Sequence, residues 1–307
     1  MAKQNIKLTD KKIESLVDEI ARTYEGDSGI NFIDVSDLPV RDKIWEIIDL
    51  FMELLFPGYT GKRTVTKANI SFIVIDILYH IYAELSDQIE RALKYRCRMD
   101  KCDSGDCRRM AEDATQHLLG RLPRIRELLK GDVGAAFDGD PAAKSYEEIV
   151  ISYPCIIAIA TYRIAHELYL RDIPLIPRIM TEWAHSKTGI DINPGAKIGK
   201  NFFIDHGTGV VIGETTVIGD NVKMYQGATL GALSFSKDER GEIIKGGRRH
   251  PTIEDNVTIY AEATILGDVV IGKDTVIGGN VWLKESVPPG VTVTTQSTEL
   301  VYKKHKE

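Results

Sequence analysis

The sequence predicts an α+β protein in which an N-terminal all-α region is followed by a parallel β-helix. Residues 1–188 carry apolar side chains at the 3.6-residue spacing of amphipathic helices, whereas from Ile192 onward an aliphatic residue recurs every six residues. Glycine usage changes at the same place, with 9 of the 26 glycines in residues 1–188 and 17 in residues 189–307. A chain of 307 residues is long enough for about two folding units.

The helical region is predicted from its apolar stripes. The first stripe follows Asp10 and uses positions 13, 16, 17 and 20. Breaks are expected at Gly58, at 101–105 and at 131–141, where glycine and polar residues gather. Most of this region is expected to provide scaffold and oligomer contacts. The further helices are expected at about 42–55, 70–95, 106–129, 146–171 and 176–186.

The six-residue repeat is typical of a parallel β-helix. Each unit forms one short strand and a turn, and three units close a triangular coil with the aliphatic residue inside. About thirteen units, a little over four coils, are present, with a two-residue slip near 209–211. The repeat stops at Leu230 and resumes at Ile253, so residues 231–251 are expected to leave the prism as a charged loop. Such loops on rigid scaffolds often carry function.

Composition excludes several classes of protein. The chain has 39 Lys+Arg against 45 Asp+Glu, a net charge of −6, so neither a nucleic acid nor an anionic membrane is an expected partner. Residues 1–7 lack the apolar core of a secretion signal. The longest apolar run, 149–160, is too short to span a bilayer. The sequence therefore predicts a cytoplasmic protein.

The four cysteines indicate neither a disulfide framework nor a metal site. Cys97, Cys102 and Cys107 lie in a polar stretch without a fourth soft ligand nearby, so we expect plain thiols and no metal. Cys155 lies in the apolar run and is expected in the core.

Polar residues beside the slip are the first candidates for chemistry. Asp205 and His206 lie where the repeat expects small residues, and Asp191 lies fifteen residues earlier, on a neighbouring coil. An Asp–His pair can act as a general base on a hydroxyl, although Asp191 could equally be a cap. Where the loop returns, Arg249 is either part of a solvated turn or a clamp for a carboxylate. Residues 207–213 are a poor dinucleotide fingerprint because no helix follows them.

Residues 191–199 and 204–215, which include Asp-His-Gly-Thr-Gly, resemble the serine O-acetyltransferases. Arg-His-Pro at 249–251 and Val-Pro-Pro-Gly at 287–290 resemble the same family of left-handed β-helix, hexapeptide-repeat acyltransferases. The resemblance covers about residues 140–290. It implies transfer of acetyl from acetyl-CoA to the hydroxyl of L-serine, giving O-acetyl-L-serine and CoA in cysteine biosynthesis, without a metal.

The resemblance also implies roles for particular residues. His206 would be the general base, and Asp191 would orient it. The family usually has His, Gly and a small residue where this chain has Asn193, Ala232 and Tyr260. The implied serine contacts are Asp140, Asp205, Arg249 and His250, and the implied acetyl-CoA contacts are Gly231 and Ala261.

The family further implies a homotrimer or a dimer of trimers, with sites between neighbouring prisms and cysteine as an inhibitor in the serine site. The expected domains are the helices (1–188), the β-helix (189–291, with loop 231–251) and a tail (292–307).

Many relatives end in an Ile that inserts into O-acetylserine sulfhydrylase, but this sequence ends in Glu307. We therefore expect little or no complex with that enzyme, and sub-micromolar binding by calorimetry would contradict this.

Three alternatives remain. A hexapeptide O-acetyltransferase for another hydroxyl, such as a sugar, would keep a catalytic His without needing Asp140 or Arg249. A γ-type carbonic anhydrase needs three zinc-binding His, and beyond residue 188 the sequence has only His206, His250 and His305. A solenoid scaffold without activity predicts that a His206→Ala substitution has no effect.

Overall fold

The structure is a computed structural model that describes residues 10–26, 29–33, 35, 37–61, 63–100, 105–234, 238, 240–242, 244 and 246–296. The chain divides into two compact units, residues 1–38 and 39–307. The first unit contains α1 (Asp10–Thr23), and the predicted apolar stripe of this helix is about half exposed. Of the tail, only residues 292–296 are described. The predicted lack of binding to O-acetylserine sulfhydrylase concerns the end of the tail, which lies outside the described residues.

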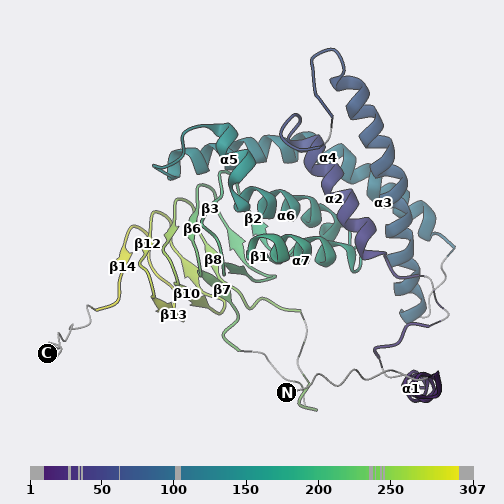
Figure 1. The fold of residues 1–307 in the computed structure, drawn as a ribbon. Helices are drawn as coiled ribbons and strands as arrows, with labels where there is room; N and C mark the ends of the chain where they lie inside the picture. The colour runs from purple at the N-terminus through teal and green to yellow at the C-terminus, as the bar shows by residue number, and fades with distance from the viewer. Residues whose placement is uncertain are drawn as a thin grey trace, which may run out of the picture. The chain divides into compact units, whose positions relative to one another are not determined.

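The second unit begins with six helices that pack around a shared apolar core (Figure 1). Local signals position several of their ends. Ser145 accepts a hydrogen bond from the N–H of Glu148 and so caps α5, and Gly189 ends α7 at φ 71°. The six helices are α2 (Arg41–Leu55), α3 (Ile70–Asp100), α4 (Cys107–Gly139), α5 (Tyr146–Ser152), α6 (Pro154–Leu170) and α7 (Ile176–Thr188).

One expectation for the helices was wrong and another was right only in part. The single helix expected over 146–171 is two helices bent by 74°, because Pro154 has no N–H to donate and Tyr153 is extended. The break expected at 131–141 occurs only at its end, since α4 continues to Gly139 and the chain leaves the helix at Asp140. Burial of Val133 and Ala136 there outweighs the low helix propensity of the neighbouring glycines.

No helix among the described residues is by itself long and apolar enough to cross a membrane. Only α5 and α6 taken together reach the required length and composition, and the 74° bend separates them.

In the described part of the chain, the prism consists of fourteen short strands in three parallel sheets. Sheet 1 has the order β1-β4-β7-β10-β13, sheet 2 the order β11-β8-β5-β2 and sheet 3 the order β14-β12-β9-β6-β3. The strands are β1 (Asp191–Ile192), β2 (Lys197–Ile198), β3 (Phe203–Asp205), β4 (Val211–Ile212), β5 (Val217–Ile218), β6 (Lys223–Tyr225), β7 (Thr229–Gly231), β8 (Thr252–Ile253), β9 (Thr258–Ile259), β10 (Thr264–Leu266), β11 (Val270–Ile271), β12 (Val276–Ile277), β13 (Trp282–Leu283) and β14 (Thr292–Val293).

The strand register confirms the predicted repeat. In sheet 1 the aliphatic residue of each strand pairs with its equivalents on the neighbouring coils, as Ile212 does with Ile192 and Leu230. These side chains are almost fully buried inside the prism. The chain leaves the prism after Gly231 and returns at Thr252, as the interrupted repeat predicted. Apolar burial along this stack is the main stabilising contribution.

A ladder of amides runs along the corner between sheets 2 and 3. Asn201, Asn221, Asn256 and Asp274 occupy the same position in successive coils, and all four have φ between 55° and 59°. Each Asn Nδ2 donates to the Oδ1 of the next residue, at 2.7, 2.9 and 2.8 Å. Asn and Asp tolerate this left-handed conformation better than other non-glycine residues. The ladder fixes the corner on four coils.

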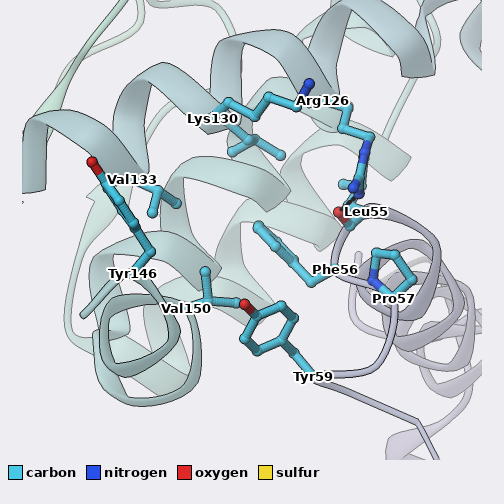
Figure 2. A pocket seen from close by; sticks show the side chains of 10 residues that line it. Leu55, Phe56, Pro57, Tyr59, Arg126, Lys130, Val133, Tyr146 and Val150 are labelled. Carbon is cyan, nitrogen blue, oxygen red and sulfur yellow. Dashed lines mark hydrogen bonds between the residues drawn. The ribbon is translucent and has the colours of Figure 1, made fainter. Parts of the chain in front are cut away.

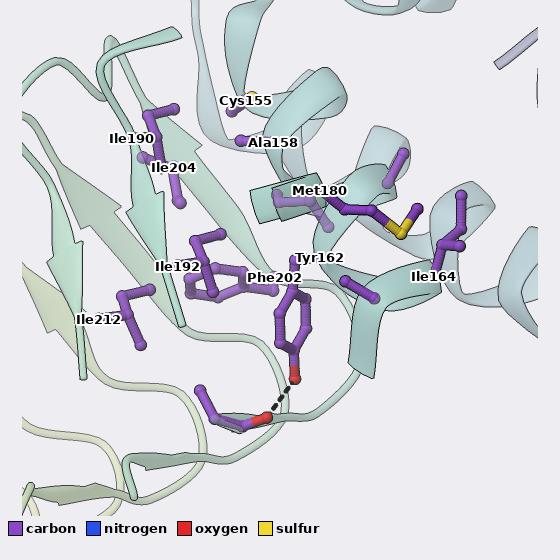
Figure 3. Packing of buried hydrophobic residues seen from close by; sticks show 14 of the residues in the cluster. Cys155, Ala158, Tyr162, Ile164, Met180, Ile190, Ile192, Phe202, Ile204 and Ile212 are labelled. Carbon is purple, nitrogen blue, oxygen red and sulfur yellow. Dashed lines mark hydrogen bonds between the residues drawn. The ribbon is translucent and has the colours of Figure 1, made fainter. Parts of the chain in front are cut away.

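A buried ion pair joins the helices to the first coil. Arg163 of α6 and Asp132 of α4 form two hydrogen bonds of 2.7 and 2.8 Å, and both side chains are almost fully buried. Arg163 also donates to Gly199 O at 2.9 Å, and Asp132 accepts the N–H of Phe202 at 2.9 Å. Figure 3 shows Tyr162 of α6 beside Phe202, with its hydroxyl bonded at 2.6 Å to Ala196 O of the prism.

The predicted core position of Cys155 is confirmed. Cys155 is 2% exposed in the core, and burial raises the pKa of its thiol to about 12. The Sγ atoms of Cys97 and Cys107 lie 3.7 Å apart, and Cys102 lies outside the described residues. The division of the chain near residue 188 stays a prediction: α7 ends at Thr188, β1 begins at Asp191, and both belong to the second unit.

Candidate active site

The predicted site residues lie at two of the three corners of the prism. The β3 corner, where sheet 3 turns into sheet 1, carries His206 after β3 and Ala261 after β9. The β8 corner, where sheet 1 turns into sheet 2, carries Gly231 after β7 and residues 249–250 before β8. Within one chain, sheet 1 separates these two groups.

At the β3 corner, a buried carboxylate lies beside an exposed imidazole. Asp205 is 8% exposed, whereas the side chain of His206 is 73% exposed and its Nε2 lies 4.0 Å from Asp205 Oδ1. His206 has φ 58°, which is unusual for a side chain of its size. Such strain clusters at functional sites, and it accompanies an imidazole that faces away from the prism interior.

The end of α4 brings a second carboxylate to this corner. Asp140 Oδ1 accepts the N–H of Ala142 at 2.8 Å, and Oδ2 accepts the hydroxyl of Tyr153 at 2.5 Å. The Tyr153 hydrogen bond, followed by that of Ala142, lowers the pKa of Asp140, with smaller contributions from Lys223 and His206. Asp140 is therefore ionised at neutral pH.

Two residues at this corner were missed by the sequence analysis. Tyr153 lies at the break between α5 and α6, and the only available signal was the Tyr-Pro pair in an apolar run. Lys223 of β6 places its Nζ 2.5 Å from Gly139 O and 3.5 Å from Asp205 Oδ2. Outward-facing positions of a β-helix accept almost any side chain, so the repeat gave no signal for Lys223.

Asp191 lies at the same corner as His206 but is paired elsewhere. Its N–H donates to Val210 O at 2.9 Å, so β1 runs beside the segment that follows His206. Its carboxylate lies 3.3 Å from the guanidinium of Arg178. Among the described residues, His206 pairs with Asp205, and Asp191 pairs with Arg178. The predicted pair of Asp191 with His206 is therefore not formed in this arrangement.

A group with possible metal ligands adjoins Asp191. The ligand atoms of Glu182, His185 and Asp191 lie within 4.8 Å of one another. Arg178 already pairs with both carboxylates, and His185 Nδ1 lies 3.3 Å from Glu182. We therefore interpret this group as an ion-pair network.

At the β8 corner, Arg249 is held by a carboxylate of its own chain. Its Nη2 lies 2.5 Å from Glu214 Oε2, and Glu214 Oε1 also accepts the hydroxyl of Tyr169 at 3.0 Å. The Arg249 hydrogen bond is the main cause that lowers the pKa of Glu214. An incoming carboxylate would therefore compete with Glu214 for the guanidinium.

The imidazole of His250 is buried against the backbone. It lies over Gly213, where a Cβ would come within 2.1 Å of the ring, so only glycine fits there. The N–H of Thr215 donates to His250 Nδ1 at 3.1 Å. Burial, followed by the charge of Arg249, lowers the pKa of His250. The ring is therefore neutral near pH 7, with its proton on Nε2.

The two predicted acetyl-CoA contacts have carbonyls that are used between coils. Gly231 O accepts the N–H of Gly267, and Ala261 O accepts the N–H of Asn280, both at 3.0 Å. Next to Ala261, the ring of Tyr260 stacks on that of Tyr225 with centroids 5.0 Å apart. These contacts leave the predicted role of Gly231 and Ala261 untested.

Cavities lie both away from and beside this site. Figure 2 shows a mainly apolar cavity of about 310 Å³ among the helices, with Phe56, Tyr59 and Tyr146 in its wall, and no predicted site residue lines it. A second cavity of about 460 Å³ lies between α4 and the prism, and its lining includes Asp138 and Lys223. On the prism, the second cavity lies against the starts of β3 and β6, beside the corner of sheets 2 and 3 that carries Asn201 and Asn221.

Comparison with known proteins covers both parts of the molecule. Residues 250–285 match the bacterial transferase hexapeptide family of six repeats. The plasmid serine acetyltransferase of Synechococcus elongatus is 47% identical over 256 residues, covering 82% of this chain and 80% of the relative. Serine acetyltransferase isoform 3 of Entamoeba histolytica, solved in complex with cysteine, has a TM-score of 0.71 at 33% identity over 96% of both chains. Soybean serine acetyltransferase complexed with serine has a TM-score of 0.53 at 29% identity, over 86% of this chain and 100% of that one.

Proposed function

Because the chain belongs to the serine acetyltransferase family, and is therefore an acyltransferase, we propose that it transfers acetyl from acetyl-CoA to the hydroxyl of L-serine. The products are O-acetyl-L-serine and CoA, in the cytoplasm and in cysteine biosynthesis. The observation that carries the proposal is the meeting of Asp140, Asp205 and His206 at the β3 corner, from α4 and β3.

In this mechanism His206 is the general base. Its imidazole removes the proton of the serine hydroxyl while that oxygen attacks the thioester carbonyl of acetyl-CoA. The C–S bond then breaks, and the departing thiolate takes the proton from the imidazolium. Asp191 orients the imidazole and stabilises its charged form, which requires its carboxylate to exchange Arg178 for His206.

The charges at the two corners suit a zwitterionic amino acid. Asp140 and Asp205 hold the ammonium group of serine, and Arg249 binds its carboxylate through the planar fork of its guanidinium. His250 adds the N–H on Nε2 as a donor. Gly231 and Ala261 line the path of the acetyl-CoA arm. Cysteine, which differs from serine by one atom, inhibits by occupying the same contacts.

The separation of the two corners supports a site shared between subunits. Arg249 and His206 lie on different edges of one prism, so they face each other only when the β8 corner of one copy meets the β3 corner of another. A homotrimer, alone or as a dimer of trimers, repeats this contact three times around a closed ring.

We expect activity to be restored when two inactive variants are mixed. His206→Ala and Arg249→Met chains, co-expressed with different affinity tags, rebuild one intact site in each mixed trimer. Random mixing then gives up to about a quarter of the wild-type rate. As a control, the pair His206→Ala and Asp205→Ala damages one corner twice and recovers nothing. Mixed trimers that stay inactive would contradict the shared site.

The function is tested by an acceptor panel. Purified protein is incubated with acetyl-CoA and L-serine, L-threonine, L-homoserine or a sugar, and the free thiol is followed with time. We expect release to depend on L-serine and to fall when cysteine is added in competition with it. Faster release with a sugar than with serine would support the alternative acyltransferase.

A further inference from the structure

Lys223 lies between the two carboxylates proposed to bind serine. From β6 its Nζ reaches Gly139 O at 2.5 Å and Asp205 Oδ2 at 3.5 Å. The Nζ also lies 4.5 Å from the ring centroid of Tyr225 and 5.2 Å from that of Phe203. The side chain is 20% exposed, so these contacts are partly shielded from water.

The contact with Gly139 fixes the end of α4. Gly139 is the last residue of that helix, and the next residue is Asp140. Cations at a helix C-terminus satisfy free carbonyls and oppose the negative end of the helix dipole. A Cβ on Gly139 would lie 2.9 Å from the Phe203 ring and 3.6 Å from Lys223 Nζ, so the helix end and the prism are in close contact here.

The contact with Asp205 sets the direction of its carboxylate. Oδ2 faces Lys223, and Oδ1 faces His206 Nε2 at 4.0 Å. The ammonium group opposes part of the charge of Asp205 and holds its carboxylate in this orientation.

We infer that Lys223 is a positioning residue that fixes Asp140 and Asp205 around the serine ammonium group. The inference rests on the proposed function. Among the described residues, the charged and titratable groups around this cluster are Asp138 and Asp140 at the end of α4, Glu148 of α5, Tyr153 before α6, Asp205 and His206 at β3, and Tyr225 of β6.

The test compares Lys223→Gln, which keeps a donor for Gly139 O but not the charge, with Lys223→Arg, which keeps the charge. For Lys223→Gln we expect KM for serine to rise about tenfold, while KM for acetyl-CoA stays within about twofold. Lys223→Arg, which keeps the cation beside Asp205, should keep the wild-type KM for serine.

The control is Lys197→Gln, which removes an exposed lysine from a strand of sheet 2. It should leave both KM values unchanged. A Lys223→Gln enzyme with lower thermal stability but a wild-type serine KM would show that the lysine only connects α4 to the prism, which overturns the inference. Wild-type protein that releases no thiol with serine would overturn the proposed function, and the inference with it.

Discussion

Replacing His206 with alanine is expected to lower kcat for acetyl transfer by about 10²- to 10⁴-fold, the usual loss when a general base is removed. The imidazole is 73% exposed at the β3 corner, so its truncation leaves no buried cavity. Folding should therefore be unaffected, and the loss should appear in turnover. The measurement is steady-state release of CoA at saturating serine and acetyl-CoA.

A matched control separates this effect from any loss of surface charge. His80 of α3 is also an exposed histidine beside a carboxylate, with Nδ1 3.5 Å from Asp76, and it lies far from the prism in sequence. His80→Ala should keep kcat within about twofold of wild type. If His206→Ala keeps a near-normal rate, His206 is not the base, and a scaffold role for the prism gains support.

Removing one partner of the buried ion pair is expected to cost about 3–5 kcal/mol of unfolding free energy, because the other charge stays buried without compensation. Asp132→Ala leaves the buried guanidinium of Arg163 without its counter-ion and the N–H of Phe202 without its acceptor. The pair joins α4, α6 and the first coil, so the loss should loosen the base of the prism. Urea unfolding followed by circular dichroism measures the difference.

An exposed pair on the same helix provides the comparison. Lys130 and Glu127 lie 2.6 Å apart on α4, but both side chains are about 60% exposed. Lys130→Ala should change the unfolding free energy by less than about 1 kcal/mol. The double variant Asp132→Leu with Arg163→Met should be more stable than either single variant, because no buried charge is left unpaired. A loss below about 1 kcal/mol for Asp132→Ala would show that the pair contributes little.

The prism was predictable because each six-residue repeat forms one side of a coil, so the spacing in the sequence gives the spacing in the structure. An aliphatic residue every six positions places Ile192, Ile212 and Leu230 one above another, and the interruption of that period located the loop. The helices were less predictable at their ends. Whether α4 stops at Gly131 or Gly139 depends on burial against other elements, which a single stretch of sequence does not contain.

The sequence named candidate site residues but not their contacts. Asp205 came from the motif around His206 and Asp140 from the family resemblance, and the structure brings both to one corner. Lys223 and Tyr153 were missed because their roles arise only where α4, α6 and β6 converge. Arg178 was missed for the same reason: no pattern signals that an arginine on α7 pairs with Asp191.

The amide ladder along the corner of sheets 2 and 3 has a direction and a terminus. Asn201 begins the ladder as a donor, and Asn221 and Asn256 each accept from the coil before and donate to the coil after, so the orientation of one amide dictates that of the next. Asp274 ends the series, because a carboxylate accepts a hydrogen bond but has no proton to pass on. The corner continues beyond Asp274, because Val287 pairs with Ile271 and the N–H of Gly290 donates to Lys273 O. Gly290 has no side chain that could accept a hydrogen bond. An asparagine at 274 would therefore leave an amide donor without a side-chain partner on the next segment, whereas an aspartate only accepts and so suits the last place in the ladder.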